Sequence, residues 1–200
     1  MHMSNERPQV AAVVLAAGLS RRLGRSKQLL PWRGTTLLGY TIATLQSAGI
    51  SQIAVVTGHD AAAVIVELAK TSVTVVHNPD YAEGQGTSVA CGARWAIQSN
   101  ARRVFFVPCD QPFLSAQHLS ALLASDQHAA AVMPRVAGRP TSPVLWADQC
   151  LLLLTQLTGE QGGRQLFTNG AVTPTYIEFA TLDLLQDIDT PEDYAALCAI

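Results

Sequence analysis

Apolar segments alternate with segments of helical spacing over residues 10–125, and this alternation is the feature that most constrains the fold. Continuous apolar runs such as VAAVVL are typical of strands that are covered on both faces. Consecutive strand–helix units predict a doubly wound α/β sheet, mostly parallel, with helices on both faces. The expected strands are 10–15, 52–56, 73–77 and 103–107, and the expected helices are 35–48, 61–70, 87–98 and 115–125.

The pattern is less regular after Met133, where we expect short strands near 130–133, 144–146 and 175–179. We predict that this part adds edge strands and a substrate-facing region to the same domain. Thr190 followed by Pro191 and two acidic residues has the composition of a helix start. The expected organisation is therefore a disordered segment at 1–9 and one domain at 10–200, with the acceptor side from about residue 134.

Charge and hydropathy exclude several classes of protein. The net charge is −2, so the chain has no basic field to hold nucleic acid. No apolar run approaches the roughly 18 to 20 residues that cross a bilayer, and the first residues lack the apolar core of an export signal. The four cysteines are scattered without a CxxC pair. We expect a cytoplasmic protein with reduced thiols and no nucleic-acid or membrane partner.

The loop after the first expected strand combines a glycine with clustered cations. It reads LAAGLSRRLGRSK, from Leu15 to Lys27. In an open α/β sheet, ligands bind beyond the carboxyl ends of the strands, and a glycine turn with nearby cations suits a polyphosphate. The loop is neither a Walker A motif nor GxGxxG. An ordinary turn with a solvated basic stretch explains the same residues about as well.

Carboxylates follow the fourth expected strand and precede the last helix. Asp110 stands in PCDQP, a tight turn in which a carboxylate can hold Mg²⁺ against phosphates. Asp187 and Asp189 alternate along an extended segment and so share one side of it. Together the three predict a metal site. The alternatives are a turn aspartate at Asp110 and a helix-capping role for Asp189.

Three further segments carry glycines or hydroxyls in expected loops. Residues 78–88, with Gly86 or Thr87 as the expected helix cap, suit a base or phosphate contact, and a plain loop explains them nearly as well. Residues 138–143 form a rigid turn that suits a substrate border. Gly162-Gly163-Arg164 offers a second anion contact or simply a helix break.

Taken together, these motifs resemble the nucleotidyltransferase superfamily of Rossmann-like, glycosyltransferase-A-type fold, which includes the MobA-like NTP transferases. The first loop resembles the pattern L-A-x-G-x-S-x-R-M-G-x-x-K-x-L-x-P, with Leu23 in place of Met. VTGHD, HNPDYAEGQGTSV, PCDQP and DIDTPEDY extend the likeness over nearly the whole chain. Within the superfamily the set is most similar to the molybdenum cofactor cytidylyltransferases.

The resemblance implies a role for each matching residue. The triphosphate clamp and catalytic groups would be Lys27, Arg21 (or Arg22 in its place) and Asp110. Asp110 would bind Mg²⁺ with Asp189 or Asp187 as the second ligand. The nucleotide would be bound by Leu15, Ala16, Ala17, Gly18, Ser20, Arg22, Gly58, Gly84 and Ser88. The acceptor would contact Gln111, Pro140 and Ser142, although Thr141-Ser142-Pro143 stands where many relatives have G-H-P.

The implied reaction transfers CMP from CTP to the terminal phosphate of molybdopterin and releases pyrophosphate. LAAG at Leu15–Gly18, where guanylyl-transferring relatives usually read LAGG, favours CTP over GTP. One alternative is a transferase that uses GTP or acts on a sugar or polyol phosphate. Another is a molybdenum cofactor chaperone for a molybdenum hydroxylase, which is also a candidate partner of the enzyme. The absence of GxGxxG disfavours a plain NAD-binding protein.

Overall fold

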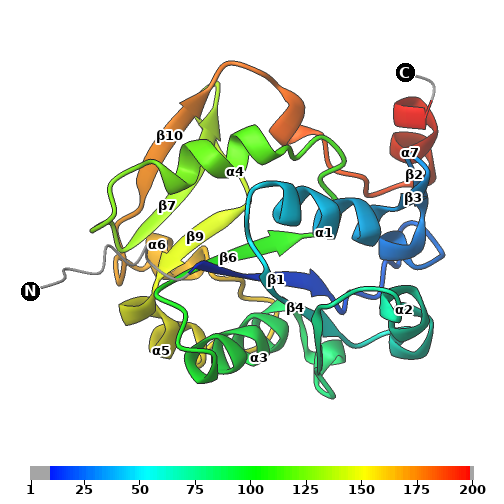
Figure 1. Ribbon diagram of the computed structural model, residues 1–200, viewed down its shortest axis with the longest axis horizontal. Coiled ribbons are helices and arrows are strands. Elements are labelled where there is room, and N and C mark those ends of the chain that lie inside the picture. Colours follow the sequence, from blue (N-terminus) through cyan, green and yellow to red (C-terminus); the bar gives the residue numbers. More distant parts are fainter. Residues whose placement is uncertain (1–9, 199–200) are drawn as a thin grey trace, which may run out of the picture.

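The structure, a computed structural model, describes residues 10–198, and its centre is one large sheet (Figure 1). The strand order is β10-β7-β9-β6-β1-β4-β5, with β8 paired to β7. These strands are β1 (Val10–Ala16), β4 (Gln52–Thr57), β5 (Thr74–His77), β6 (Arg103–Pro108), β7 (Ala131–Val136), β8 (Arg139–Pro140), β9 (Val144–Ala147) and β10 (Thr175–Phe179). The predicted α/β architecture is confirmed.

The parallel part of the sheet brings four strand ends to one edge. β1 lies between β6 and β4 and is parallel to both, and β4 is parallel to β5. The carboxyl ends of these strands therefore meet beside each other. The segments that follow them, including the loop after β1 and the turn at Asp110, share this edge.

The prediction that the later strands are edge strands is wrong for two of them. β9 pairs antiparallel with β6 on one side and with β7 on the other, so both β9 and β7 lie inside the sheet. Of these three later strands, β10, parallel to β7, lies at one edge of the sheet, and β5 forms the opposite edge. The interior position explains the burial of Leu145 and Trp146, each 1% exposed.

Helices cover both faces of the sheet. One apolar cluster includes residues of α1 (Leu37–Ser47), α2 (Ala61–Leu68) and α4 (Ala116–Leu123), and the other includes residues of α3 (Gln85–Gln98), α5 (Leu151–Leu154) and α6 (Gln165–Thr168). In Figure 1, α1 and α4 lie above the sheet and α3 and α5 below it. Along β1, Ala12 and Val14 face the first cluster while Ala11 and Val13 face the second. The continuous apolar run follows from burial on both faces.

The helix predicted to begin at Thr35 begins instead at Leu37. Thr35 and Thr36 form β3, which pairs antiparallel with β2 (Pro31–Trp32). Arg33 and Gly34 both have positive φ and make the tight turn between these strands. Thr36 then caps α1, since its hydroxyl accepts a hydrogen bond from the Gly39 backbone N–H at 3.0 Å.

The N-termini of three other helices lie near the predicted positions. The cap of α3 is Gly84 rather than Gly86 or Thr87, because the helix begins at Gln85. Ser115 caps α4 as predicted. α7 (Pro191–Cys198) begins after Thr190, whose hydroxyl accepts from the Asp193 N–H at 3.1 Å. Single-turn 3₁₀ helices lie at η1 (Lys27–Leu29), η2 (Tyr81–Glu83), η3 (Asp148–Cys150) and η4 (Asp183–Leu185).

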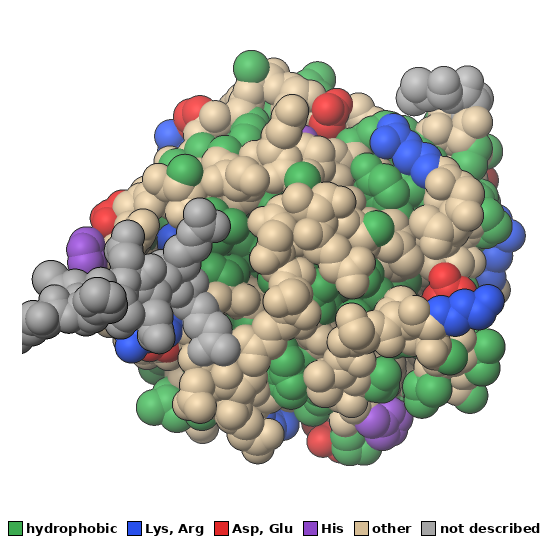
Figure 2. Space-filling model, viewed as in Figure 1, with side chains coloured by type: hydrophobic (Ala, Val, Ile, Leu, Met, Phe, Trp, Pro, Cys, Tyr) green, Lys and Arg blue, Asp and Glu red, His purple; other side chains and the backbone are tan. Residues whose placement is uncertain are grey.

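The surface is mixed in character. On the face drawn in Figure 2, the Lys and Arg side chains are scattered among apolar and polar groups rather than gathered in one patch. Within residues 10–198, no helix combines the length and apolar character needed to cross a membrane. The predicted disordered segment 1–9 lies outside the residues that the structure describes.

Candidate active site

A cavity of about 370 Å³ opens at the carboxyl ends of β1, β5 and β6. Its walls come from the loop after β1, the segment that leads into α3, and the turn after β6. A Cβ added to Gly18 would meet no protein atom within 4 Å, so the missing side chain leaves space in the cavity rather than serving packing. The predicted residues on its wall are Leu15, Ala16, Ala17, Gly18, Ser20, Arg21, Arg22, Lys27, Gly84, Ser88, Asp110 and Asp189.

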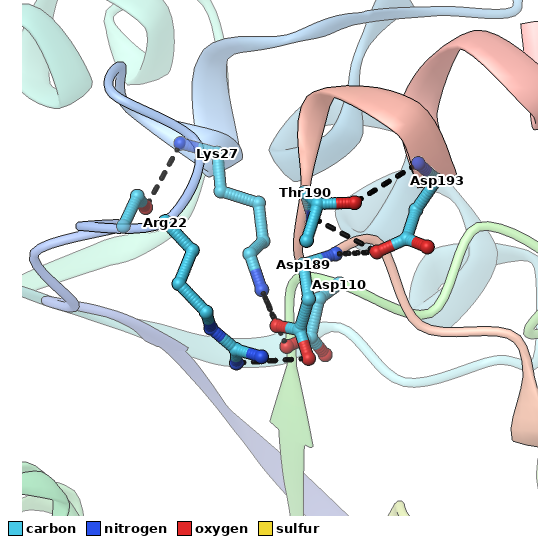
Figure 3. Close-up of polar contacts among 7 residues, drawn as sticks. Arg22, Lys27, Asp110, Asp189, Thr190 and Asp193 are labelled. Carbon is cyan, nitrogen blue, oxygen red and sulfur yellow. Dashed lines mark hydrogen bonds and ion pairs between the residues drawn. The ribbon is translucent and has the colours of Figure 1, made fainter.

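Lys27 joins two carboxylates at the edge of this cavity. Its Nζ donates to Asp110 Oδ2 at 3.1 Å and to Asp189 Oδ1 at 2.7 Å. The Arg22 guanidinium approaches the other oxygen of Asp189, at 3.0 Å. Figure 3 shows the Lys27 and Arg22 side chains converging on the two carboxylates from one side. Arg22, rather than Arg21, is therefore the arginine that reaches the predicted metal-binding carboxylates.

The loop after β1 is folded so that Lys27 points back into the cavity. Ser20 has a positive φ of 47°, a conformation that non-glycine residues seldom adopt. Its carbonyl accepts from the N–H groups of Leu23 and Gly24, and its hydroxyl accepts from the Lys27 N–H at 3.1 Å. The hydrogen bonds of Ser20 therefore hold the loop in a closed turn and fix the position of the Lys27 backbone.

Asp189 is held by the start of α7. Its N–H donates to Asp193 Oδ2 at 3.1 Å, and the same carboxylate accepts from the Thr190 N–H at 2.8 Å. One residue earlier, the Ile188 N–H donates to the Asp110 carbonyl at 2.9 Å, and the Ile188 side chain is fully buried. These bonds tie the last loop of the chain to the turn after β6. Asp189 therefore lies next to the residues that cap α7, and it also lines the first cavity.

The charges in the site shift one another's pKa values. Burial alone lowers the pKa of Lys27, but Asp110 and Asp189 outweigh it and hold the pKa above its ordinary value. Burial alone raises the pKa of Asp189, but Lys27 and Arg22 hold it below its usual range. Burial, helped by the charges of Asp110 and Asp189, raises the pKa of Asp187 to about 6. The walls of the cavities at Asp110 carry four carboxylates (Asp110, Glu160, Asp187 and Asp189) and four cations (Arg21, Arg22, Lys27 and Arg164), so their formal charges balance.

A second cavity of about 390 Å³ adjoins the first. Asp110 lines both cavities, together with Leu15, Gln85 and Pro108. Arg164 is the cationic residue on its wall, and its guanidinium donates to Ser142 Oγ at 3.3 Å. Gln111 and Asp187 also face this space. Since the two cavities meet at Asp110, two bound molecules would approach each other there.

Asp187 and Asp189 do not share one face as predicted. Residues 186–190 form a loop rather than the end of a strand, because their backbone bonds run to Asp110 and Asp193 instead of to a neighbouring strand. Asp187 lines the second cavity and Asp189 the first. The Asp187 and Asp189 carboxylates therefore lie in different cavities, and Asp110 lines both of these cavities.

Two predicted residues lie away from the cavity walls. Gly58 packs behind the first cavity, where an added Cβ would come within 2.5 Å of the Tyr81 Cβ and 2.9 Å of the Ala17 Cβ. Pro140 is exposed on β8. Tyr81 and Gln85 of the predicted 78–88 segment also line the first cavity, together with Glu160, which no predicted segment included. Glu160 precedes the predicted Gly162-Gly163-Arg164 segment but has no motif of its own.

The donor set fits a hard divalent cation that keeps part of its water shell. Asp110 and Asp189 offer carboxylate oxygens at one point, currently bridged by Lys27. Within residues 10–198, no three His, Cys, Asp or Glu side chains are arranged to enclose a metal ion. Mg²⁺ typically uses one or two carboxylates together with substrate phosphates and water, and does not need a cage of protein ligands.

Comparison with known proteins places the chain in a family. Residues 12–173 match the MobA-like NTP transferase domain. The chain belongs to the MobA-like NTP transferase family. This confirms the family that the sequence motifs resemble, and with it the expected fold and enzyme class.

Relatives of this MobA-like transferase cover nearly its full length. Molybdenum cofactor cytidylyltransferase of Escherichia coli is 33% identical, over 92% of this chain and 93% of its own. Purine catabolism protein PucB of Bacillus subtilis is 31% identical, over 94% and 95%. The crystal structure of Rv0371c from Mycobacterium tuberculosis has a TM-score of 0.84 and 29% identity, covering 96% of this chain and 98% of that one. The same protein has been solved as a manganese complex.

As a MobA-like transferase, the protein is a nucleotidyltransferase with a Rossmann-like fold. The two adjoining cavities suit a reaction between two molecules. The names of the relatives differ, so family membership alone does not define the acceptor.

Proposed function

We propose that this protein is a Mg²⁺-dependent cytidylyltransferase that transfers CMP from CTP to the terminal phosphate of molybdopterin, releasing pyrophosphate. The observation that carries the proposal is the position of Asp110, bound to Lys27 on the boundary between two cavities. A transferase needs its two substrates to meet at the groups that stabilise charge. The similarity to molybdenum cofactor cytidylyltransferase over nearly the whole chain supports the choice of substrates.

The first cavity is the proposed nucleotide site. Lys27 and Arg22 give its rim two cations, and the small residues Ala16, Ala17 and Gly18 let phosphates approach the backbone. Gly84 and Ser88, at the start of α3, line the part proposed for the base. LAAG at Leu15–Gly18, where guanylyl-transferring relatives usually read LAGG, supports CTP rather than GTP.

The second cavity is the proposed acceptor site. Arg164 supplies a positive charge for an anionic acceptor, and Ser142, its hydrogen-bond partner, shares the wall. Gln111 is almost fully buried, and its amide donates to the Leu184 carbonyl at 3.0 Å, which fixes its orientation. Trp146 and Phe106 give the cavity an apolar wall. A ring system with a phosphate at one end matches this combination.

The transfer needs no covalent enzyme intermediate. An oxygen of the acceptor phosphate bonds to the α-phosphorus of CTP, and the bond between that phosphorus and the α,β-bridging oxygen breaks. The electron pair leaves with pyrophosphate. The acceptor phosphate is already ionised near neutral pH, so no protein base has to remove a proton. Lys27 and Arg22 neutralise charge that develops on the leaving group.

The metal proposed for Asp110 and Asp189 is Mg²⁺. When bound, it supplies positive charge that offsets the repulsion between phosphates and polarises the phosphoryl oxygens. The proximity of the Asp110 and Asp189 carboxylates, which both contact Lys27, supports a cation at this point. The manganese complex of Rv0371c supports a divalent metal in this family, although it does not distinguish between metals.

The deciding experiment measures pyrophosphate release with Mg²⁺ and each of CTP, GTP, ATP and UTP, with and without molybdenum-loaded molybdopterin. We expect release only when CTP and molybdopterin are both present, with a cytosine dinucleotide as the second product. Release with GTP instead would assign a guanylyltransferase. Release only with a sugar or polyol phosphate would assign another acceptor. Tight binding of molybdopterin without release would favour the chaperone.

A further inference from the structure

Asn78 is a buried amide that links the end of β5 to the start of α3. Its side chain is among the least exposed polar groups of the chain, with 2% of the residue accessible. Its Nδ2 donates to Thr87 Oγ1 and to Ser88 Oγ, each at 2.9 Å. A primary amide nitrogen carries two hydrogens, so both donors are used on these two hydroxyls.

The orientation of this amide is fixed by the backbone. Asn78 Oδ1 accepts from the Asp80 N–H at 3.0 Å. If the amide were turned over, its NH₂ group would face that N–H and two donors would oppose each other. The Asn78 nitrogen must therefore point at Thr87 and Ser88, and both hydroxyl oxygens must accept from it.

The two hydroxyls differ in where their own hydrogens go. Thr87 Oγ1 lies 2.9 Å from both the Asp80 and the Gly84 carbonyl oxygens, so its hydrogen is donated to the backbone. Among residues 10–198, no protein atom accepts a hydrogen bond from the Ser88 hydroxyl. Ser88 is also the one of the pair that lines the first cavity. With its oxygen already accepting from Asn78, Ser88 has a hydrogen to offer to a molecule in the cavity.

We propose that Asn78 is a positioning residue that holds the Ser88 hydroxyl as a hydrogen-bond donor toward the base and thereby selects cytosine over uracil. This inference rests on the proposal that the first cavity binds a nucleoside triphosphate. Cytosine has a lone pair at N3, which accepts from a hydroxyl. Uracil has N3–H at the same place, and a donor would face a donor. A site built to donate at this point rejects the base that cannot accept there.

The first test measures nucleotide binding by calorimetry with Mg²⁺ and without an acceptor. CTP, UTP and 3-deaza-CTP are compared, because 3-deaza-CTP keeps the shape of CTP but has C–H in place of N3. We expect CTP to bind the unmodified protein tighter than either analogue, by roughly 5- to 150-fold for one unpaired buried donor. Ser88→Ala should bind all three about equally. Equal affinities for CTP and 3-deaza-CTP in the unmodified protein, or tighter binding of GTP than of CTP, would overturn the inference.

The second test examines Asn78 itself. Asn78→Asp replaces the NH₂ donor with an oxygen, so the Ser88 hydroxyl turns its hydrogen inward and presents lone pairs to the base. The CTP:UTP affinity ratio should fall at least about tenfold and move toward UTP. Asn78→Ala removes the donor without replacing it by an acceptor, so the ratio should fall without reversing. This second variant keeps the test decisive if a buried carboxylate prevents folding.

Thr87→Val is the matched control. It removes the other hydroxyl that Asn78 binds, and it lies outside the cavity wall. It should lower thermal stability but leave the CTP:UTP ratio unchanged. If it changes the ratio as much as Asn78→Ala does, Asn78 acts only through general structure. If CTP is discriminated as expected but no transfer to molybdopterin occurs, the proposed acceptor is wrong and the role of Asn78 stands.

Discussion

The Lys27 ammonium lies 2.7 Å from the Asp189 carboxylate, although 162 positions separate the two residues in the chain. One comes from the loop after the first strand and the other from the loop before the last helix. Their contact, together with the Lys27–Asp110 bond, joins three distant segments around one charge. Because the three depend on one another, changes at any of them should act on the same step.

Lys27→Met should reduce turnover by about 10²- to 10³-fold, the usual effect of removing one group that stabilises transition-state charge. The side chain is 15% exposed, so methionine can occupy the space while the protein stays folded. Steady-state pyrophosphate release measures the effect. Lys70 is the other lysine of the chain and is exposed after α2, so Lys70→Met is the matched control. A rate for Lys27→Met close to that of the control would show that the assigned site is wrong.

Asp110→Asn should abolish most turnover, and added Mg²⁺ should not restore it, because the amide keeps the shape but loses the charge that binds a cation. Asp189→Asn should weaken the response to Mg²⁺ more than Asp187→Asn, since Asp189 shares the first cavity with Lys27. Activity measured against Mg²⁺ concentration separates these cases. Asp148→Asn is the control, since the Asp148 N–H bonds to Arg102 at the opposite end of β6. The reverse order for Asp187 and Asp189 would exchange their proposed roles.

Gly86→Ala and Gly18→Ala should have opposite effects. A Cβ at Gly86 would lie 2.6 Å from the Thr158 carbonyl oxygen, and backbone cannot move aside easily. We expect a loss of about 1 to 3 kcal/mol in unfolding free energy, measured by denaturant titration. A Cβ at Gly18 meets no protein atom but projects where we place the nucleotide. That variant should keep its stability and lose CTP affinity; the opposite result for either glycine would contradict this interpretation.

Folding stability should fall below about pH 6.5 in part because of His118. Burial lowers its pKa, against the smaller opposing effect of Asp183. Its Nδ1 accepts from the Ser115 N–H at 3.3 Å, which requires the neutral ring. Since the folded pKa lies below the unfolded value of about 6.5, the stabilisation is complete above that value and is lost as the pH falls toward the folded pKa.

His118→Gln tests this directly, because glutamine at the same position can also accept from the capping N–H. Urea unfolding at pH 7.5 and pH 5 should show a smaller difference between the two pH values for this variant than for the unmodified protein. His128→Gln changes an exposed loop histidine and should leave the difference as it is. An unchanged pH response in His118→Gln would show that other groups control acid sensitivity.

The strand–helix order and most of the cavity wall could be predicted from the sequence because both depend on local patterns. The continuous apolar run VAAVVL predicts a strand that is buried on both faces. The glycines and arginines of the loop after it predict a turn that suits a phosphate. The position of β9 between β6 and β7 could not be predicted, since pairing order depends on contacts between distant segments. The same holds for Glu160, an exposed residue in a loop without a motif, which reaches the cavity only through the packing of that loop against α3.

The wall shared by the two cavities has a consequence for what happens after the reaction. A dinucleotide formed at Asp110 would touch both linings at once, whereas each substrate touches one. Loss of pyrophosphate removes only the contacts around Lys27 and Arg22. The product should therefore have a longer residence time than either substrate, and its release should limit the overall rate. If release is limiting, a receiving protein that takes the product directly from this surface should raise the turnover rate.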